Sequence, residues 1–307
     1  MSSEVTKAQD LPCEPETRGA TVPGNFAPTV AVDLVRGVSA LQALPEVAQK
    51  VRDIAADPQG TVTNLAEIIT SDPALASKLL KLANSAFYGL PSQVSSIHRA
   101  IVILGFKTVQ NLALAGALCG IFRGARISPI FSGYDLWKHC LAVAVAARKL
   151  AKAADVFNPE EAFLAGVTHD VGMLAVRDAK PDRLAAAIAK AQQGMAFLQA
   201  ERTEFGTDHT EVGWALTSVW RFPDNLRLVC RHHHAPADTT GKIALLIHTI
   251  HLADWLCGQK RIGLYLTQPQ GPACSESLQV LGLEKSVLGD IRTTLDDDIA
   301  EAERVFS

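Results

Sequence analysis

A helical spacing of apolar residues recurs along the chain, and this feature most constrains the fold. Leu44, Val47 and Val51 keep the 3–4 spacing of one buried helical stripe. No run of alternating β-branched residues occurs, aromatic residues make up only 6% of the chain, and alanine is frequent, a composition that favours helices over strands. We therefore predict an all-α protein, a helical bundle in two lobes.

Capping residues and glycine indicate where individual helices begin and end. Asp72 followed by Pro73 is typical of an N-cap with proline at the first helical position, so we expect a helix to begin there. Gly105 separates two further predicted helices, 97–104 and 106–118. These local signals agree with the apolar spacing and support the all-α prediction.

The order of the segments predicts four parts. Four prolines and little apolar periodicity in the first 36 residues predict a flexible or loosely docked arm. The expected parts are the arm (1–36), an N-terminal helical lobe (37–122), a second helical lobe (123–262) and a C-terminal loop and helix (263–307). The last helix, 284–306, is expected either to pack back on the protein or to mediate self-association.

Charge and cysteine content limit the partners and the compartment. Lys and Arg total 29 against 32 for Asp and Glu, so a nucleic acid or an anionic membrane would need a local patch. Six cysteines without a C-x-x-C pair argue against disulfides and thiolate zinc sites and favour a reducing cytoplasm. The N-terminus lacks a signal-peptide pattern, and the longest apolar stretch, 112–122, is shorter than the about 20 residues that span a bilayer.

Histidine and aspartate side chains gather in the second predicted lobe. His139, the His169-Asp170 pair, His209 and the triplet 232–234 lie on four predicted helical segments, with Asp254 on a fifth. Imidazole nitrogens and carboxylate oxygens are ligands that divalent ions accept, and bundles hold metals between facing helices. Each residue also has an ordinary interpretation as a core histidine, a helix cap or part of a surface loop. Spacing alone leaves both interpretations open, and we assign only the ordinary one to His98, His248 and His251.

Five short motifs follow one another in a fixed order across this lobe. They are W-K-H (137–139), T-H-D-V-G (168–172), H-T-E-V-G (209–213), H-H-A-P (233–236) and H-L-A-D (251–254). This order resembles the HD phosphohydrolase superfamily. Upstream, S-D-P-A-L-A-S-K-L-L-K-L-A-N-S-A-F-Y-G (71–89) and S-I-H-R-A-I-V-I-L-G (96–105) are similar to the N-terminal helices of the HDOD family, the signalling branch of that superfamily. The resemblance covers roughly residues 38–260.

The resemblance implies a metal centre. Carried over residue by residue, the superfamily pattern implies that the ligands are His139, His169, Asp170, His209, His233 or His234, and Asp254. It also implies that Asp170 bridges two divalent ions (Fe, Mn, Zn or Ni) and that His169 and Asp170 form the catalytic pair. Asp135 stands one helical turn before His139 and is a further candidate carboxylate ligand.

Two positions depart from the related HD-GYP phosphodiesterases. Those enzymes carry a lysine after H-D-x-G, where this chain has Met173, and a glycine-tyrosine-proline segment after the histidine pair, where this chain reads A-P-A-D-T-T-G. The departures argue against hydrolysis of cyclic diguanylate and leave another phosphoester open. Arg231, beside the histidine triplet, is the candidate phosphate contact, and a surface salt bridge is its alternative role.

Three functions remain open at this point. The leading hypothesis is a cytoplasmic, bacterial-type signal-transduction protein of HDOD architecture that retains an HD-type metal site and acts mainly through a signalling partner. The alternative is an active metal-dependent phosphohydrolase or phosphodiesterase acting on a nucleotide or another phosphoester. A third possibility is a purely structural metal that ties the helices together.

Segment 95–118 bears on the choice of partner. It loosely resembles a helix-turn-helix, but its second helix is nearly all apolar after Asn111. An apolar helix of this kind belongs to a core, which favours a partner-binding groove over DNA recognition. We therefore expect a protein partner, with nucleic acid and membrane disfavoured and a homo-oligomer open.

Overall fold

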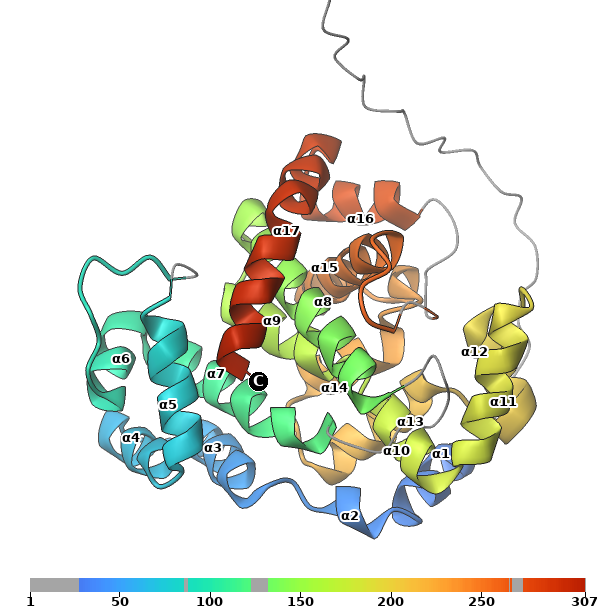
Figure 1. The fold of residues 1–307 in the computed structure, drawn as a ribbon, viewed down its shortest axis with the longest axis horizontal. Coiled ribbons are helices and arrows are strands. Elements are labelled where there is room, and N and C mark those ends of the chain that lie inside the picture. The colour runs from blue at the N-terminus through green and yellow to red at the C-terminus, as the bar shows by residue number, and fades with distance from the viewer. Residues whose placement is uncertain (1–27, 86–87, 123–131, 265, 267–272, 307) are drawn as a thin grey trace, which may run out of the picture.

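The computed structural model describes residues 28–85, 88–122, 132–264, 266 and 273–306. Within these ranges every regular element is helical and no strand occurs, which confirms the predicted all-α class (Figure 1). The N-terminal helices are α1 (Pro28–Arg36), α2 (Ser39–Gln42), α3 (Glu46–Ala56), α4 (Val62–Thr70), α5 (Pro73–Ala83), α6 (Ile97–Leu104) and α7 (Phe106–Leu118), followed by the 3-10 turn η1 (Cys119–Phe122).

The rest of the chain is equally helical. Its elements are α8 (Gly133–Ala154), α9 (Pro159–Thr168), α10 (Gly172–Ala179), α11 (Pro181–Gln192), α12 (Phe197–Phe205), α13 (His209–Val219), α14 (Asp224–His232), the 3-10 turn η2 (Pro236–Asp238), α15 (Gly241–Gln259), α16 (Ala273–Leu281) and α17 (Lys285–Phe306). No helix of the described residues is both long and apolar enough to cross a membrane.

Local signals set the N-terminal helix boundaries as the sequence predicts. The Asp72 side chain accepts hydrogen bonds from the backbone N–H groups of Ala74 and Leu75, both at 3.0 Å, and Pro73 opens α5. Gly105 has a φ of +91° and separates α6 from α7. Both predicted boundaries are confirmed.

The start of the folded part differs from the expected arm of residues 1–36. Residues 28–36 form α1, whose Ala31, Leu34 and Val35 are buried, and this helix packs against α10 and α13. These three residues keep the 3–4 spacing of a short helical stripe, which the neighbouring prolines obscure in the sequence. Residues 1–27 lie outside the described residues, and so do residues 123–131 of the division that we expect between the lobes, around 123–133.

Two long helices, α8 and α15, form the centre of the molecule (Figure 1). Both are buried on nearly every side, and α8 packs closely against α9 because Gly166 has no side chain. A Cβ on Gly166 would lie 2.5 Å from the Cα of Ala144. Such close backbone approach requires glycine. The close packing brings the histidine-bearing ends of these helices together.

The C-terminal helix α17 packs back onto the protein. Its Ile291, Leu295 and Ile299 are buried, and the helix lies along α8. At its end, Lys78 of α5 donates a hydrogen bond to the carbonyl oxygen of Phe306 at 2.9 Å. The helix thereby links the N-terminal helices to the central ones.

Candidate metal centre

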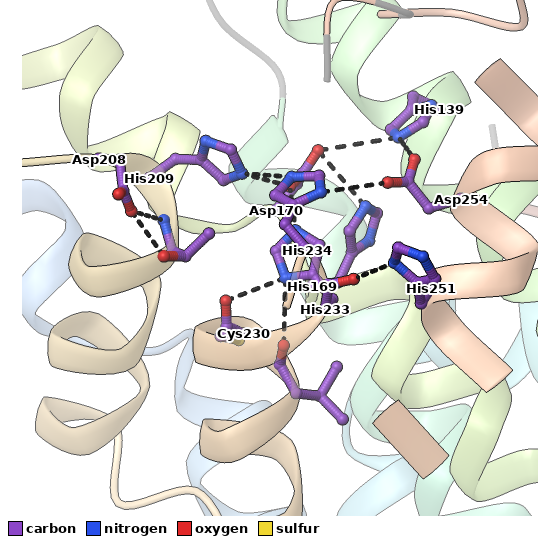
Figure 2. A network of polar contacts seen from close by, with 12 residues as sticks. His139, His169, Asp170, Asp208, His209, Cys230, His233, His234, His251 and Asp254 are labelled. Atoms are coloured by element: carbon purple, nitrogen blue, oxygen red, sulfur yellow. Dashed lines mark hydrogen bonds and ion pairs between the residues drawn. The ribbon is translucent and has the colours of Figure 1, made fainter. Parts of the chain in front are cut away.

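Seven of the expected ligands converge on one buried point, although they come from five separate places in the chain (Figure 2). His139 projects from α8 and Asp254 from α15. His169 and Asp170 lie at the end of α9, His209 opens α13, and His233 and His234 follow α14. Apart from His234, whose side chain is 8% exposed, these side chains are at most 1% exposed.

Two glycines allow the helices to approach closely enough to form this cluster. A Cβ on Gly172 would lie 2.0 Å from the carbonyl oxygen of His209, so the turn after Asp170 packs directly on the start of α13. Gly263 has a φ of +63°, and its Cβ would lie 2.6 Å from the backbone nitrogen of His139. Neither position accepts a side chain without moving the backbone of a candidate ligand.

Three of the imidazole rings are oriented by hydrogen bonds between Nδ1 and a backbone carbonyl oxygen. The Nδ1 of His169 lies 2.7 Å from the carbonyl oxygen of Gly166. The same contact joins His233 to Cys230 at 3.0 Å and His139 to Ile262 at 3.3 Å. Because a carbonyl oxygen only accepts, Nδ1 carries the proton and Nε2 keeps its lone pair.

Asp170 lies between two sets of imidazole nitrogens. Its Oδ1 is 3.3 Å from Nε2 of His209 and 3.4 Å from Nε2 of His233. Its Oδ2 is 3.4 Å from Nε2 of His169 and 3.7 Å from Nε2 of His139. One carboxylate therefore presents one oxygen to each set.

The possible ligand atoms divide into two groups around this carboxylate. One consists of Asp170, His209, His233 and His234, and the other of His139, His169 and Asp254; within each, the ligand atoms lie within 4.8 Å of one another. Asp254 completes the second group with its Oδ1 3.1 Å from Nε2 of His139. Its Oδ2 is 3.8 Å from Nδ1 of His234, so the two groups adjoin here as well as at Asp170.

The donor atoms fit a divalent metal because many of them have no partner within the described part of the chain. The unpartnered buried atoms include Nε2 of His139, His169 and His233 and both carboxylate oxygens of Asp170 and Asp254. A buried polar group left without a partner costs about 1–3 kcal/mol, and more if it is charged. A cation between the two groups would satisfy these atoms together, and nitrogen and oxygen donors are the ligands such cations accept.

The pKa shifts of Asp170 and His209 also indicate that the centre favours a positive charge. Burial raises the pKa of Asp170, but His169 and His209 outweigh burial and hold that pKa well below its ordinary value. Burial lowers the pKa of His209, yet Glu201 and Asp170 hold it well above its ordinary value. Burial also lowers the pKa of His233, which keeps this ring neutral. A bound cation would take the place of the proton that His209 carries between two carboxylates.

Glu201 of α12 belongs to the centre, although the sequence analysis does not identify it. Its Oε2 accepts hydrogen bonds from Nδ1 of His209 at 2.6 Å and from the His209 backbone N–H at 3.2 Å, and the side chain is fully buried. Burial raises the pKa of Glu201 against the opposing influence of His209. The sequence offers no signal that separates Glu201 from the neighbouring Glu204, whose carboxylate pairs with Lys190.

His251 also contacts the centre, although the sequence analysis assigns it an ordinary role. Its Nδ1 lies 2.6 Å from the carbonyl oxygen of His233, and its buried Nε2 has no partner among the described residues. His248, on the same helix, instead pairs with Ser277 at 2.9 Å. His251 therefore fixes the backbone that carries the histidine pair and lies outside both donor groups.

Two further candidates lie outside the donor groups. The Asp135 carboxylate is hydrogen-bonded to Ser132 at the start of α8. Arg231 forms an ion pair with Glu211 at 2.9 Å, and its guanidinium lies 5.0 Å from the ring centroid of Trp214. The arrangement of Arg231 corresponds to the surface salt bridge that the sequence leaves open as its alternative role.

Comparisons with known proteins agree with this architecture. A family model described as “HDOD domain” matches residues 41–236. An “Uncharacterized protein” of Treponema pallidum (strain Nichols) is 23% identical over 235 residues, which cover 73% of this chain and 44% of that relative. The chain thus spans less than half the length of that curated relative.

Two solved structures share the fold. The structure of an HDOD domain protein with unknown function from Geobacter sulfurreducens superposes with a TM-score of 0.77 at 24% identity, covering 91% of this chain and 97% of the other. A Shewanella amazonensis protein named “Putative phosphohydrolase” superposes with a TM-score of 0.70 at 22% identity, covering 92% and 100%. At these identities the likeness shows the fold, and activity has to be argued from the residues of this chain.

Proposed function

The chain belongs to the HDOD family, and from this premise we propose that it is a signal-transduction protein built around a divalent metal centre and acting mainly through a protein partner. The observation that carries the proposal is the position of Asp170. Its two buried oxygens have no hydrogen-bond partner in the described structure and face imidazole nitrogens on both sides. This arrangement suits a carboxylate shared between two cations.

Each of the two donor groups would hold one metal ion. Asp170, His209, His233 and His234 would hold one ion, and His139, His169 and Asp254 the other, with Asp170 shared. Hydrogen bonds at Nδ1 keep four of the rings, those of His139, His169, His209 and His233, oriented with Nε2 toward the centre, which is the usual role of groups behind a metal ligand. His234 is the most exposed of the set, so its side offers the approach for a ligand from solvent.

A second candidate function is phosphoester hydrolysis with His169 and Asp170 as the catalytic pair. It is supported by the two adjoining donor groups, because paired divalent ions polarise phosphoryl oxygens and lower the pKa of water toward neutrality. The name of the Shewanella amazonensis neighbour is consistent with this function. The protein's own residues would hold and shield the reacting group, and Arg231 would need to leave Glu211 to contact a phosphate.

The metal proposal is tested by elemental analysis of protein purified without an affinity tag. We expect about one to two equivalents of iron, zinc, manganese or nickel, which disappear in the double variant His169→Ala, Asp170→Ala. His248→Ala is the matched control, because it removes a buried histidine that pairs with Ser277 outside the centre. Folded wild-type protein that binds no divalent metal, even after incubation with each ion, would contradict the proposal.

The hydrolysis candidate needs a separate measurement. Metal-loaded protein would be assayed against a panel of nucleotides and a chromogenic phosphodiester with manganese or iron. Turnover that is lost in Asp170→Ala supports an enzyme. Metal-loaded protein without turnover on any substrate leaves the signalling proposal and removes the enzymatic one.

A further inference from the structure

The helices α5 to α7 belong to a stretch of chain without acidic residues. From 73 to 134 the sequence contains no Asp or Glu, although these residues occupy 32 of the 307 positions. The same stretch contains Lys78, Lys81, Arg99 and Lys107 within its helices. A chain with a net charge of −3 therefore has a locally basic region at its N-terminal helices.

Three of these cations are exposed and unpaired. Lys81, Arg99 and Lys107 lie at the surface of α5, α6 and α7, and none forms an ion pair with any described residue. Several cations elsewhere in the described chain are paired, as Lys149 is with Asp298 and Lys260 with Asp296. The basic charge on α5 to α7 is thus available to a partner outside the chain.

An open groove lies on the same helices. It has a volume of about 740 Å³ and is lined by Pro73, Ala76, Leu80, Lys81, Asn84 and Gln93, among others. The Asn84 side chain fixes one wall, because it donates to the carbonyl oxygen of Val94 at 2.8 Å and accepts from the Val94 backbone N–H at 2.7 Å. Hydrogen bonds therefore fix the shape of the groove between α5 and the segment that leads into α6.

Exposed aliphatic side chains accompany the charge. Val102 and Ile103 of α6 are 58% and 37% exposed, among the few large apolar residues that reach the surface. Helix α6 contacts both α5 and α7, so the helix that carries these side chains adjoins the helices that carry the groove and the other cations (Figure 1). Apolar surface rimmed by polar residues is typical of an interaction site.

We propose that α5, α6 and α7 form a docking surface for an acidic, partly apolar polypeptide segment of a partner protein. Carboxylates on the partner complement Lys81, Arg99 and Lys107, and its apolar side chains cover the groove and the exposed Val102. A single-stranded nucleic acid fits less well, because bases stack on aromatic rings and none of the described residues that line the groove is aromatic.

This inference deepens the proposed signalling function by naming the chemistry of its partner, and it rests on that function. The surface lies on α5 to α7, whereas the donor groups lie on α8 to α15 and the turns between them. Peptide binding and metal content are therefore measured separately. Failure of the docking test leaves the metal proposal standing, and a metal-free protein that binds the peptide leaves the docking surface standing.

The test uses the full chain and fluorescence anisotropy with labelled synthetic peptides. Two peptides share the same leucine positions and carry either glutamate or glutamine at the others, and an oligothymidylate serves as the nucleic-acid probe. We expect the glutamate peptide to bind about tenfold more tightly than the glutamine peptide at low salt, and to weaken as salt is added. The triple variant Lys81→Glu, Arg99→Glu, Lys107→Glu should lose about tenfold in affinity for the glutamate peptide.

A charge-matched control separates this surface from net charge. Lys180→Glu, Lys285→Glu, Arg292→Glu changes three exposed cations at other sites and should leave peptide binding unchanged. Circular dichroism and the melting temperature establish that both variants are folded. The proposal is overturned if the glutamate peptide does not bind, if the glutamine peptide binds equally, if the triple variant binds like wild type, or if the oligothymidylate binds more tightly than the glutamate peptide.

Discussion

The N-terminal helices and the central helices use their polar residues in opposite ways. Helices α4 to α6 each bury an apolar stripe and expose their polar side chains. Of the buried polar and charged residues in the described chain, Gln110 alone belongs to α1–α7, whereas α8 to α15 enclose the histidines and aspartates of the centre. The first region is stabilised by ordinary burial and caps, and the second keeps inside polar groups that have no hydrogen-bond partner among the described residues.

This contrast teaches where each kind of substitution acts. In the N-terminal helices a substitution should lower the free energy of unfolding only by the loss of its local contact, because neighbouring polar groups are solvated. In the centre the donor groups share Asp170 and adjoin at Asp254, so a change at one position disturbs several atoms. Three substitutions measure the difference, from the largest expected effect to the smallest.

Gly172→Ala should have the largest effect. The new Cβ would lie 2.0 Å from the carbonyl oxygen of His209 and 2.6 Å from the backbone nitrogen of Gly213, so α10 and α13 must separate. We expect a loss of about 3 kcal/mol in the free energy of unfolding, together with reduced metal content. Gly289→Ala is the control, because nothing lies within 4 Å of its Cβ and alanine in a helix gains up to about 1 kcal/mol. Equal stability of the two variants in urea unfolding would contradict the close packing described for the centre.

Glu201→Gln should weaken metal binding without unfolding the protein. The glutamine keeps an oxygen near Nδ1 of His209 but removes the negative charge that strengthens this imidazole as a donor. We expect the dissociation constant for zinc or manganese to rise by about 10- to 100-fold in a competition titration. Glu204→Gln, on the same helix, removes the partner of Lys190 and should leave the affinity unchanged. If both variants bind metal alike, Glu201 has only a structural role.

Asp72→Ala should have the smallest effect and should not reach the metal. Two backbone N–H groups of α5 lose their acceptor, which costs about 1 kcal/mol of unfolding free energy. Asp72→Asn retains a capping oxygen and should restore most of the loss. A change in metal content of the alanine variant would show that the two regions are coupled more strongly than their contacts indicate.

The sequence predicts the parts of the fold that depend on local signals. Asp72 and Gly105 act within a few residues of themselves, so their roles are visible without a structure. The seven donors now found together were identifiable by residue type and motif order, and their metal-binding role remains a prediction. The start of α1 could not be predicted, because its buried stripe consists of only three apolar residues and follows a proline-rich segment.

Contacts between distant segments could not be predicted. Glu201 and Glu204 are equivalent in the sequence, and only the packing of α12 against the start of α13 buries the first one. Asp135 lies one turn from His139 on its helix, but Ser132 engages its carboxylate, which helical periodicity does not reveal. The burial of Glu201 and the pairing of Asp135 both depend on where a neighbouring side chain is placed in the fold. The spacing of apolar residues carries no information about that placement.

The spread of the donors along the chain has a consequence for how the protein is made. His139 lies on α8 and Asp254 on α15, with the other donors between them, so no short segment contains either donor group. Contacts across such long loops form late, because closing the loop loses conformational entropy before the stabilising contacts have formed. During synthesis the group of His139, His169 and Asp254 stays incomplete until α15 has left the ribosome and docked on α8, whereas the other group needs no residue of α15. A metal ion held by the group that contains Asp254, as we propose, would therefore bind only after α15 has docked and would mark the chains that have finished folding.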